Sequence, residues 1–292
     1  NERATELLKR AESLDVRIYA FWSGGIDSTL LLISLLKNAT APKKERITVL
    51  LNEDSISENP NFYREHILGK LDMDSSAGFH YLLGGPHLLV GGEHNDQLFG
   101  SDVVGKLIVK HGPSVVHARY DRSLFFSFFR EAAGDDETTD FYLDMFDQLA
   151  RKAPFPLVSH FDRLWWINFS LKWQSVFMRM LSYTAPRNIA AVDAAYIKTR
   201  YNHFYGTDDF QLWSMNNHDK KIKDAWNTYK WPCKDIIYDY TKDAEYRDNK
   251  IKRGSLHFLL TQRSPFNFID ADMKFHHALD AAEYYDPMND FV

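Results

Sequence analysis

The sequence predicts an α/β fold, in which a doubly wound, mostly parallel sheet is followed by a helical C-terminal part. Three observations predict this fold. Short apolar runs alternate with helical patterns as far as residue 115. A Gly-Gly turn connects the first apolar run to a helix that is apolar on nearly every face. Beyond residue 115, apolar residues recur at three- and four-residue spacing, which is typical of packed helices.

The alternation in the first part predicts its elements in order. A polar amphipathic pattern predicts the first helix, and an apolar run then predicts a buried strand. The Gly-Gly turn and the apolar helix after it begin a strand-helix-strand crossover, which is typical of a parallel sheet with helices on both faces. The expected segments are a helix at 2–14, a strand at 16–22, a helix at 27–37, a strand at 47–51, a helix at 61–71, and short apolar runs at 79–83 and 88–90.

The second part is helical and rich in aromatic residues. Trp165, Trp166 and Trp173 suggest either a stacking platform for bases or core packing, and their helical spacing favours the core. The acidic run 135–137 follows Gly134 and is interpreted as the first turn of a helix, not as a metal cluster. Helices are expected at 123–133, 137–151 and 160–180.

Composition and charge exclude several classes of function. The chain has 35 Lys and Arg against 40 Asp and Glu, a net charge of −5, and no block of five like charges, so nucleic acid is not expected as a partner. The longest apolar run, 30–36, is interrupted by Ser34, and neither a membrane span nor a leader is expected. We therefore expect a cytoplasmic protein. Cys233 is a single cysteine, which excludes an internal disulfide and favours a packed thiol.

A phosphate cradle is predicted where the first strand runs into the next helix. Its two glycines allow backbone conformations that turn N–H groups toward an anion, and the helix N-terminus adds its positive dipole end. The hydroxyl groups supply further donors, and the carboxylate of Asp27 indicates a Mg²⁺ ion between it and the phosphates. A plain turn with an aspartate helix cap is the alternative. The segment consists of Ser23, Gly24, Gly25, Ile26, Asp27, Ser28 and Thr29.

A second polar segment follows the apolar run at 88–90 and also opens a helix. Because parallel strands end at one edge of a sheet, Asp96 in this segment is expected to face Asp27. Two carboxylates that converge on one triphosphate suit an octahedral magnesium ion, so both are predicted metal ligands. The segment contains Gly91, Gly92, Glu93, His94, Asn95, Asp96, Gln97, Leu98, Phe99 and Gly100.

These two segments resemble motifs of one known superfamily. Residues 23–29 resemble the pyrophosphate loop of the N-type ATP pyrophosphatases, and residues 92–100 resemble the Gly-Glu-Gly-x-Asp-Glu-Leu-Phe-Gly segment of their asparagine synthetase and beta-lactam synthetase branch. The resemblance implies a Rossmann-like, adenine nucleotide alpha hydrolase-like fold without a glutaminase domain. It implies an ATP-binding domain at 1–115 and a mainly helical substrate or cap region at 116–292. His94 replaces a family glycine, and Gln97 replaces a family glutamate.

The resemblance also implies a reaction. The expected enzyme is an ATP-dependent ligase that forms a C–N bond and releases AMP and pyrophosphate. It adenylates a substrate carboxylate or carbonyl for attack by ammonia or an amine, and ammonia would come free or from a separate glutaminase. ATP and Mg²⁺ are the expected cofactors, with Asp27 and Asp96 as catalytic residues. Adenine is expected near the end of the second strand, from Leu51 to Asp54.

A third, fainter resemblance lies farther along the chain. The stretch from Lys234 to Gly254 is similar to the family's distal Lys-x-x-x-Arg to Arg-x-Lys region. It implies that Lys252 neutralises the pyrophosphate and that Lys250 stands in the place of the arginine. A solvated run of charge is the alternative. By letter, residues 100–106 also fit the pattern GxxxxGK, but they fall inside a helical pattern and are interpreted as a chance match.

Two further departures leave the function open. Asp27 and Asp96 are 96 minus 27, or 69, residues apart, which is short for the asparagine synthetase branch. The family's Glu-Thr-aromatic-acid motif, which supplies a general base, is absent between them. The alternatives are therefore an enzyme that adenylates a nucleobase or tRNA, and an ATP-binding regulatory protein that has lost catalysis.

Overall fold

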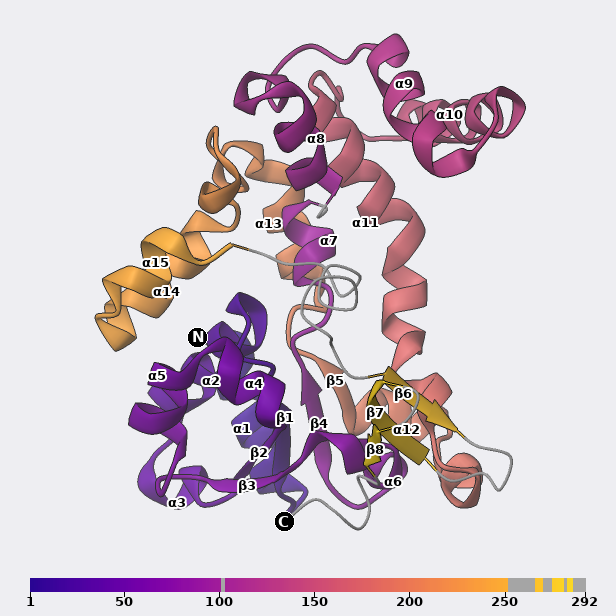
Figure 1. The fold of residues 1–292 in the computed structure, drawn as a ribbon. Helices are drawn as coiled ribbons and strands as arrows, with labels where there is room; N and C mark the ends of the chain where they lie inside the picture. Colours follow the sequence, from indigo (N-terminus) through magenta and orange to yellow (C-terminus); the bar gives the residue numbers. More distant parts are fainter. Residues whose placement is uncertain (101–102, 252–265, 270–274, 281–282, 286–292) are drawn as a thin grey trace.

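A five-stranded parallel sheet is the centre of the fold in the computed structural model, which describes residues 1–100, 103–251, 266–269, 275–280 and 283–285 (Figure 1). The strand order is β3-β2-β1-β4-β5, and all neighbouring pairs are parallel. The predicted α/β class with a parallel sheet is thus confirmed. The strands are β1 Ile18–Phe21, β2 Ile47–Leu51, β3 Asp72–Ser75, β4 Leu88–Gly91 and β5 Tyr201–His203.

The strand order reverses between β1 and β4. The chain builds outward from β1 through β2 to β3, and then returns to the other side of β1 to form β4 and β5. Ala20 of β1 pairs with Val49 of β2 and with Val90 of β4, so the three strands end at the same edge of the sheet. In doubly wound sheets the crevice outside such a reversal is where ligands bind.

Helices cover both faces of the sheet, as a doubly wound fold requires. Ile18, Val49 and Val90 point into the larger core, which they share with helices α1 (Glu2–Ser13) and α2 (Ile26–Asn38). Leu50 and Leu89 point to the opposite face and pack in a smaller cluster with Leu181, Tyr196 and Tyr201. Strand residues therefore alternate between two apolar layers, and both faces of the sheet are buried.

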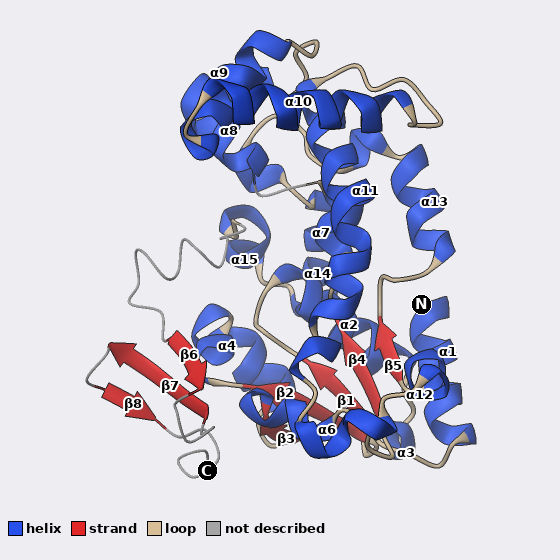
Figure 2. Ribbon diagram, turned by 90° about the vertical axis from the view of Figure 1, so that its right-hand side faces the viewer, coloured by secondary structure: helices blue, strands red, loops and turns tan. Residues whose placement is uncertain are grey.

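The helices between residues 95 and 179 and between residues 208 and 249 stand above the carboxyl edge of the sheet (Figure 2). The longest, α11, descends from the α9–α10 hairpin to this edge and packs against α7, while α14 packs against α2. The helices are α1 Glu2–Ser13, α2 Ile26–Asn38, α3 Ala41–Lys44, α4 Glu53–Glu58, α5 Pro60–Phe62, α6 Phe79–Leu82, α7 Asn95–Phe99, α8 Val103–His111, α9 Arg122–Ala133, α10 Asp136–Arg151, α11 His160–Arg179, α12 Ala194–Thr199, α13 Asp208–Asn216, α14 Trp231–Thr241 and α15 Ala244–Asn249.

A second, antiparallel sheet lies near the C-terminal end of the chain. Its strand order is β6-β7-β8, and the strands are β6 Phe266–Ile269, β7 Phe275–Asp280 and β8 Glu283–Tyr285. The sequence analysis did not predict these strands. Among the described residues, no helix is both long and apolar enough to cross a membrane.

Several expected segments differ from the structure. Strand β3 was not predicted, because the polar edge strand Asp72–Ser75 buries no apolar side chain. The apolar run 79–83 is the short helix α6 and not a strand. The helix expected at 61–71 is α5 followed by a five-residue π-helical segment that ends at Ile67.

The division near residue 115 stays a prediction. Strand β5 lies beyond it in the sequence and nevertheless pairs with β4 at the edge of the N-terminal sheet. Helix α14, also beyond it, packs against α2. The C-terminal part of the chain therefore contributes directly to the α/β layer.

The aromatic and acidic patterns of the helical part form ordinary structure. Trp165 and Trp166 are buried in the core, as predicted. Trp173 is partly buried and stacks on His94. Gly134 ends α9 with a φ of 90°, and Asp135 caps α10 by accepting a hydrogen bond from the Thr138 amide.

Candidate active site

The loop after β1 is a tight turn that leads into α2. Gly24 has a φ of +74°, and a Cβ there would collide with the Ser55 carbonyl oxygen, so only glycine fits. The amide of Ser23 donates to Ser28 Oγ at 3.0 Å, and this bond folds the loop over the first turn of α2. Below it, Trp22 Nε1 donates to Thr29 Oγ1 at 3.1 Å. The loop thus places the N–H groups of the α2 N-terminus at its mouth.

The segment after β4 packs directly against this loop. A Cβ on Gly92 would lie 3.2 Å from the Ser28 amide nitrogen, so the missing side chain lets the two segments approach. His94 has a φ of 74°, in the left-handed region, and precedes the first residue of α7. His94 therefore adopts a backbone conformation that is more common for glycine.

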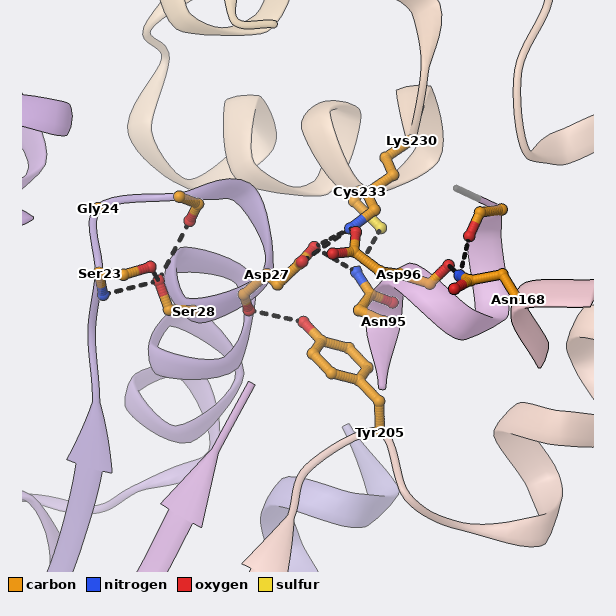
Figure 3. A network of polar contacts seen from close by, with 12 residues as sticks. Ser23, Gly24, Asp27, Ser28, Asn95, Asp96, Asn168, Tyr205, Lys230 and Cys233 are labelled. Carbon is orange, nitrogen blue, oxygen red and sulfur yellow. Dashed lines mark hydrogen bonds and ion pairs between the residues drawn. The ribbon is translucent and has the colours of Figure 1, made fainter. Parts of the chain in front are cut away.

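Asp27 and Asp96 meet at a buried lysine (Figure 3). Lys230 Nζ lies 2.6 Å and 2.7 Å from the two carboxylate oxygens of Asp27 and 2.7 Å from Asp96 Oδ1. The Lys230 side chain is 1% exposed, against 20% for Asp27 and 34% for Asp96. One ammonium group therefore binds both predicted metal ligands from below, while each carboxylate keeps a face toward solvent.

Neighbouring polar groups hold this cluster in place. Asn95 Nδ2 donates to Asp27 Oδ1 at 2.6 Å, and it lies 3.9 Å from Cys233 Sγ. The Tyr205 hydroxyl donates to the Asp27 carbonyl oxygen at 2.7 Å. Burial raises the pKa of the Cys233 thiol to about 12, so Cys233 is a packed thiol, as predicted, and not a nucleophile.

A cavity of about 1120 Å³ opens above the carboxyl edge of the sheet. It joins both predicted segments to the end of β2, to one side of α11 and to β5, so its walls come from both parts of the chain. Its lining residues include Ser23, Asp27, Ser28, Leu50, Asn52, Phe79, Gly91, Gly92, Glu93, Asp96, Gln97, Asn168, Lys172, Ser175, Arg179, Tyr201 and His203.

Glu93 and Arg179 form an ion pair across this cavity. Glu93 belongs to the segment after β4, and Arg179 is the last residue of α11. Burial raises the pKa of the Glu93 carboxyl group, and the nearby Arg179 guanidinium opposes this shift. Glu93 is therefore a carboxylate that a ligand in the cavity can contact and whose basicity is increased by its surroundings.

Two histidines attach α11 to the site. His94 Nε2 donates to the Trp173 carbonyl oxygen at 3.0 Å, and His203 Nε2 donates to the Phe177 carbonyl oxygen at 3.2 Å. Their ring centroids are 4.6 Å apart, and within the described part of the chain neither Nδ1 atom has a hydrogen-bond partner. Burial lowers the pKa of His94 to about 4 and that of His203 to about 3. Both imidazoles are thus neutral near pH 7.

Some of the predicted site residues line the cavity, and others support the loop that borders it. Ser23, Asp27, Ser28, Asp96, Gly91, Gly92 and Glu93 line it. Gly24, Gly25, Ile26 and Thr29 shape the loop or lie beneath it, and Ile26 and Thr29 are buried. Leu51 packs into the larger core, while its neighbours Leu50 and Asn52 line the cavity.

The distal lysines are only partly described. Lys252 lies outside the described residues, so its predicted position stays a prediction. Lys250 forms an ion pair with Glu58, a residue that also lies close to Gly24. Lys234 donates to the carbonyl oxygens of Asn227 and Lys250 and so holds the backbone after α15.

Sequence reasoning missed Lys230, which is the residue that joins the two aspartates. Its neighbours Tyr229 and Trp231 are aromatic, and a lysine between aromatic residues ahead of a helix is a signal of burial. A buried lysine needs hydrogen-bond acceptors and is often paired with a carboxylate, which makes Asp27 and Asp96 candidate partners. The sequence around Arg179 and Asn168 has no comparable feature that would mark these two residues as part of the site.

The carboxylates of the site suit a magnesium ion that is bound to a nucleotide. Asp27 and Asp96 offer carboxylate oxygens to the cavity, which are the ligands that Mg²⁺ prefers. Among the described residues, no group of three or more His, Cys, Asp or Glu side chains could hold a metal ion alone. A magnesium ion here would therefore need phosphate oxygens and water to complete its shell.

Comparison with known proteins gives no relative. No protein-family model, no curated protein and no solved structure matches this chain. The likeness to the N-type ATP pyrophosphatases therefore rests on the residues of the two segments and on their geometry.

We predict that replacement of Lys230 destabilises the fold through the two aspartates. In Lys230→Met the carboxylates of Asp27 and Asp96 lose their shared cation, and the free energy of unfolding should fall by about 2–4 kcal/mol. This is somewhat less than for a fully buried pair, because both aspartates are partly exposed. Urea denaturation measures the change. Adding Asp27→Asn should cost less in Lys230→Met than in the wild type, and additive effects would contradict the shared cluster.

A second prediction concerns pH. Because burial lowers the pKa of His94 and His203, the unfolded chain takes up protons below about pH 6.5 that the folded chain does not. Stability should therefore fall as pH decreases from about 6.5 toward 4, by up to about 1.4 kcal/mol per pH unit for each imidazole. His94→Asn should reduce this slope. His111→Asn, at an exposed position of α8, should leave it unchanged, and equal slopes in both variants would refute the explanation.

Proposed function

We propose that this protein is an ATP-dependent ligase of asparagine synthetase type. It would adenylate a substrate carboxylate and transfer the acyl group to ammonia or an amine, releasing pyrophosphate and AMP. The observation that carries the proposal is the meeting of the two resembling segments at the strand reversal, where Asp27 and Asp96 line one cavity. A plain turn with an aspartate cap offers no reason for this convergence.

The nucleotide would lie along the N-terminal side of the cavity. Leu50, Asn52 and Phe79 line the part beside the end of β2, where an adenine ring would pack. The phosphates would lie against Ser23 and the first turn of α2, whose unpaired N–H groups favour an anion. This arrangement keeps adenine at the end of β2, although the contacts come from the neighbours of Leu51 and not from its side chain.

Asp27 and Asp96 would hold Mg²⁺ between themselves and the phosphates. The ion supplies positive charge that stabilises the leaving pyrophosphate. Lys230 fixes the spacing of the two carboxylates and offsets part of their repulsion toward a triphosphate. Lys252 stays the proposed distal contact to pyrophosphate.

The substrate acid would lie between Glu93, Arg179 and β5. Its carboxylate oxygen attacks the α-phosphorus of ATP, a P–O bond forms, and the bond to the pyrophosphate oxygen breaks. The amine nitrogen then attacks the acyl carbon, the C–O bond to AMP breaks, and the nitrogen gives up a proton. Glu93 is the cavity carboxylate that can accept this proton, because burial raises its pKa. Glu93 thus takes the place of the absent family base.

An ATP-binding regulatory protein is the second candidate. It is favoured by the way Lys230 already binds both aspartates, and by Gln97 in place of the glutamate found in the resembling family. Pyrophosphate release distinguishes the candidates. An assay with Mg-ATP and a panel of carboxylic acids, each with ammonia or amines, should show pyrophosphate formed only in the presence of an acid. Nucleotide binding with no pyrophosphate from any acid would favour the regulatory protein.

We predict that Asp27 and Asp96 act as one magnesium site. Asp27→Asn and Asp96→Asn should each sharply weaken Mg-ATP binding and turnover, and the double variant should cost little more than the worse single one, because ligands of one ion act as a unit. Isothermal titration with Mg-ATP measures this without a known acid. Asp239→Asn, at an exposed position of α14, is the matched control and should bind as the wild type does. Undiminished affinity in the double variant would refute the shared site.

A further inference from the structure

A polar stripe on α11 faces the cavity. Asn168, Lys172, Ser175 and Arg179 all line it, at spacings of four, three and four residues. This spacing places the four side chains on one side of the helix, over a length of about 16 Å. Each side chain carries hydrogen-bond donors. The phosphate loop and the carboxylates of the two motifs line the same cavity, so α11 presents donors where an anion would enter.

The turn that carries Lys172 is fixed to the second motif on both sides. One turn earlier, Asn168 Nδ2 donates to the Asp96 carbonyl oxygen at 3.0 Å and also to that of Gly100. One residue later, the Trp173 carbonyl oxygen accepts from His94, and the two rings stack with centroids 4.2 Å apart. The backbone of Lys172 therefore has a defined position relative to the metal-ligand candidate Asp96.

The charges around the cavity leave Lys172 available. Arg179 is paired with Glu93, and Lys230 is buried beneath Asp27 and Asp96 and does not line the cavity. In the portion of the chain described by the structure, the exposed Lys172 ammonium has neither an ion pair nor a hydrogen bond. A flexible lysine that reaches into a phosphate cradle is a point charge suited to phosphate oxygens.

We propose that Lys172 binds the β- and γ-phosphates of ATP, which leave as pyrophosphate. This inference rests on the proposed function, and it adds a phosphate contact that neither motif contains. The two aspartates repel a triphosphate unless cations surround it. Magnesium would supply positive charge at the two carboxylates, and Lys172 supplies a further positive charge from α11. α11 would thus take part in nucleotide binding as well as in forming the acid subsite.

The test compares ligands with and without the β- and γ-phosphates. Isothermal titration of wild type and Lys172→Met with Mg-ATP, magnesium pyrophosphate and AMP reports the contact directly. The variant should lose about tenfold or more in affinity for Mg-ATP and for pyrophosphate, because a charge-assisted hydrogen bond is lost. Its affinity for AMP should stay unchanged. Lys172 is exposed, so the variant should keep the melting temperature of the wild type.

Lys198→Met is the matched control, since Lys198 is exposed on α12 and does not line this cavity. It should bind all three ligands as the wild type does. Equal Mg-ATP affinity in Lys172→Met and wild type would overturn the inference and leave the proposed function intact. Equal losses for Mg-ATP and AMP would also overturn it, because the lysine would then act away from the leaving phosphates. A wild type that binds no nucleotide at millimolar concentration would overturn the proposed function itself.

Discussion

The ammonium group of Lys230 lies between the carboxylates of Asp27 and Asp96, and the arrangement of the site depends on this contact. The two carboxylates stabilise the buried ammonium group, and the ammonium group offsets part of the repulsion between the carboxylates. The three residues come from three separate parts of the sequence. The cluster ties the loop after β1, the segment after β4 and the start of α14 into one structure (Figure 3).

The fold places these groups together through the order of its strands. Because β1 and β4 are neighbours at the point where the order reverses, the segments that follow them meet above the same crevice. Glycine at 92 permits the close approach of these two segments, and glycine at 24 lets the first loop pack against Ser55 and Glu58. On the far side, α11 completes the cavity and is attached by His94 and His203. The neutral state of these imidazoles makes that attachment sensitive to acid.

Much of the fold follows from local pattern. The buried strands β1, β2 and β4 and the apolar helix α2 have continuous apolar sequences, so their existence and class were predictable. The edge strand β3 is polar and exposed, and β5 has three residues, so neither carries a periodic signal. Their strand geometry comes from pairing with β2 and β4, which is a tertiary contact. Strand β5 lies beyond residue 115 and pairs with β4, so the two parts of the chain on either side of that residue share one sheet.

For the site, the sequence by itself pointed to the two polar segments and the pair of aspartates, because glycines, hydroxyls and carboxylates follow two buried strands. Only the tertiary structure decided that the ammonium group of Lys230 lies between the two aspartates. Lys230 is 203 residues from Asp27 and 134 from Asp96, and no local pattern encodes a contact over that distance. The same holds for Glu93 with Arg179 and for Lys172, whose roles depend on where α11 crosses the edge of the sheet.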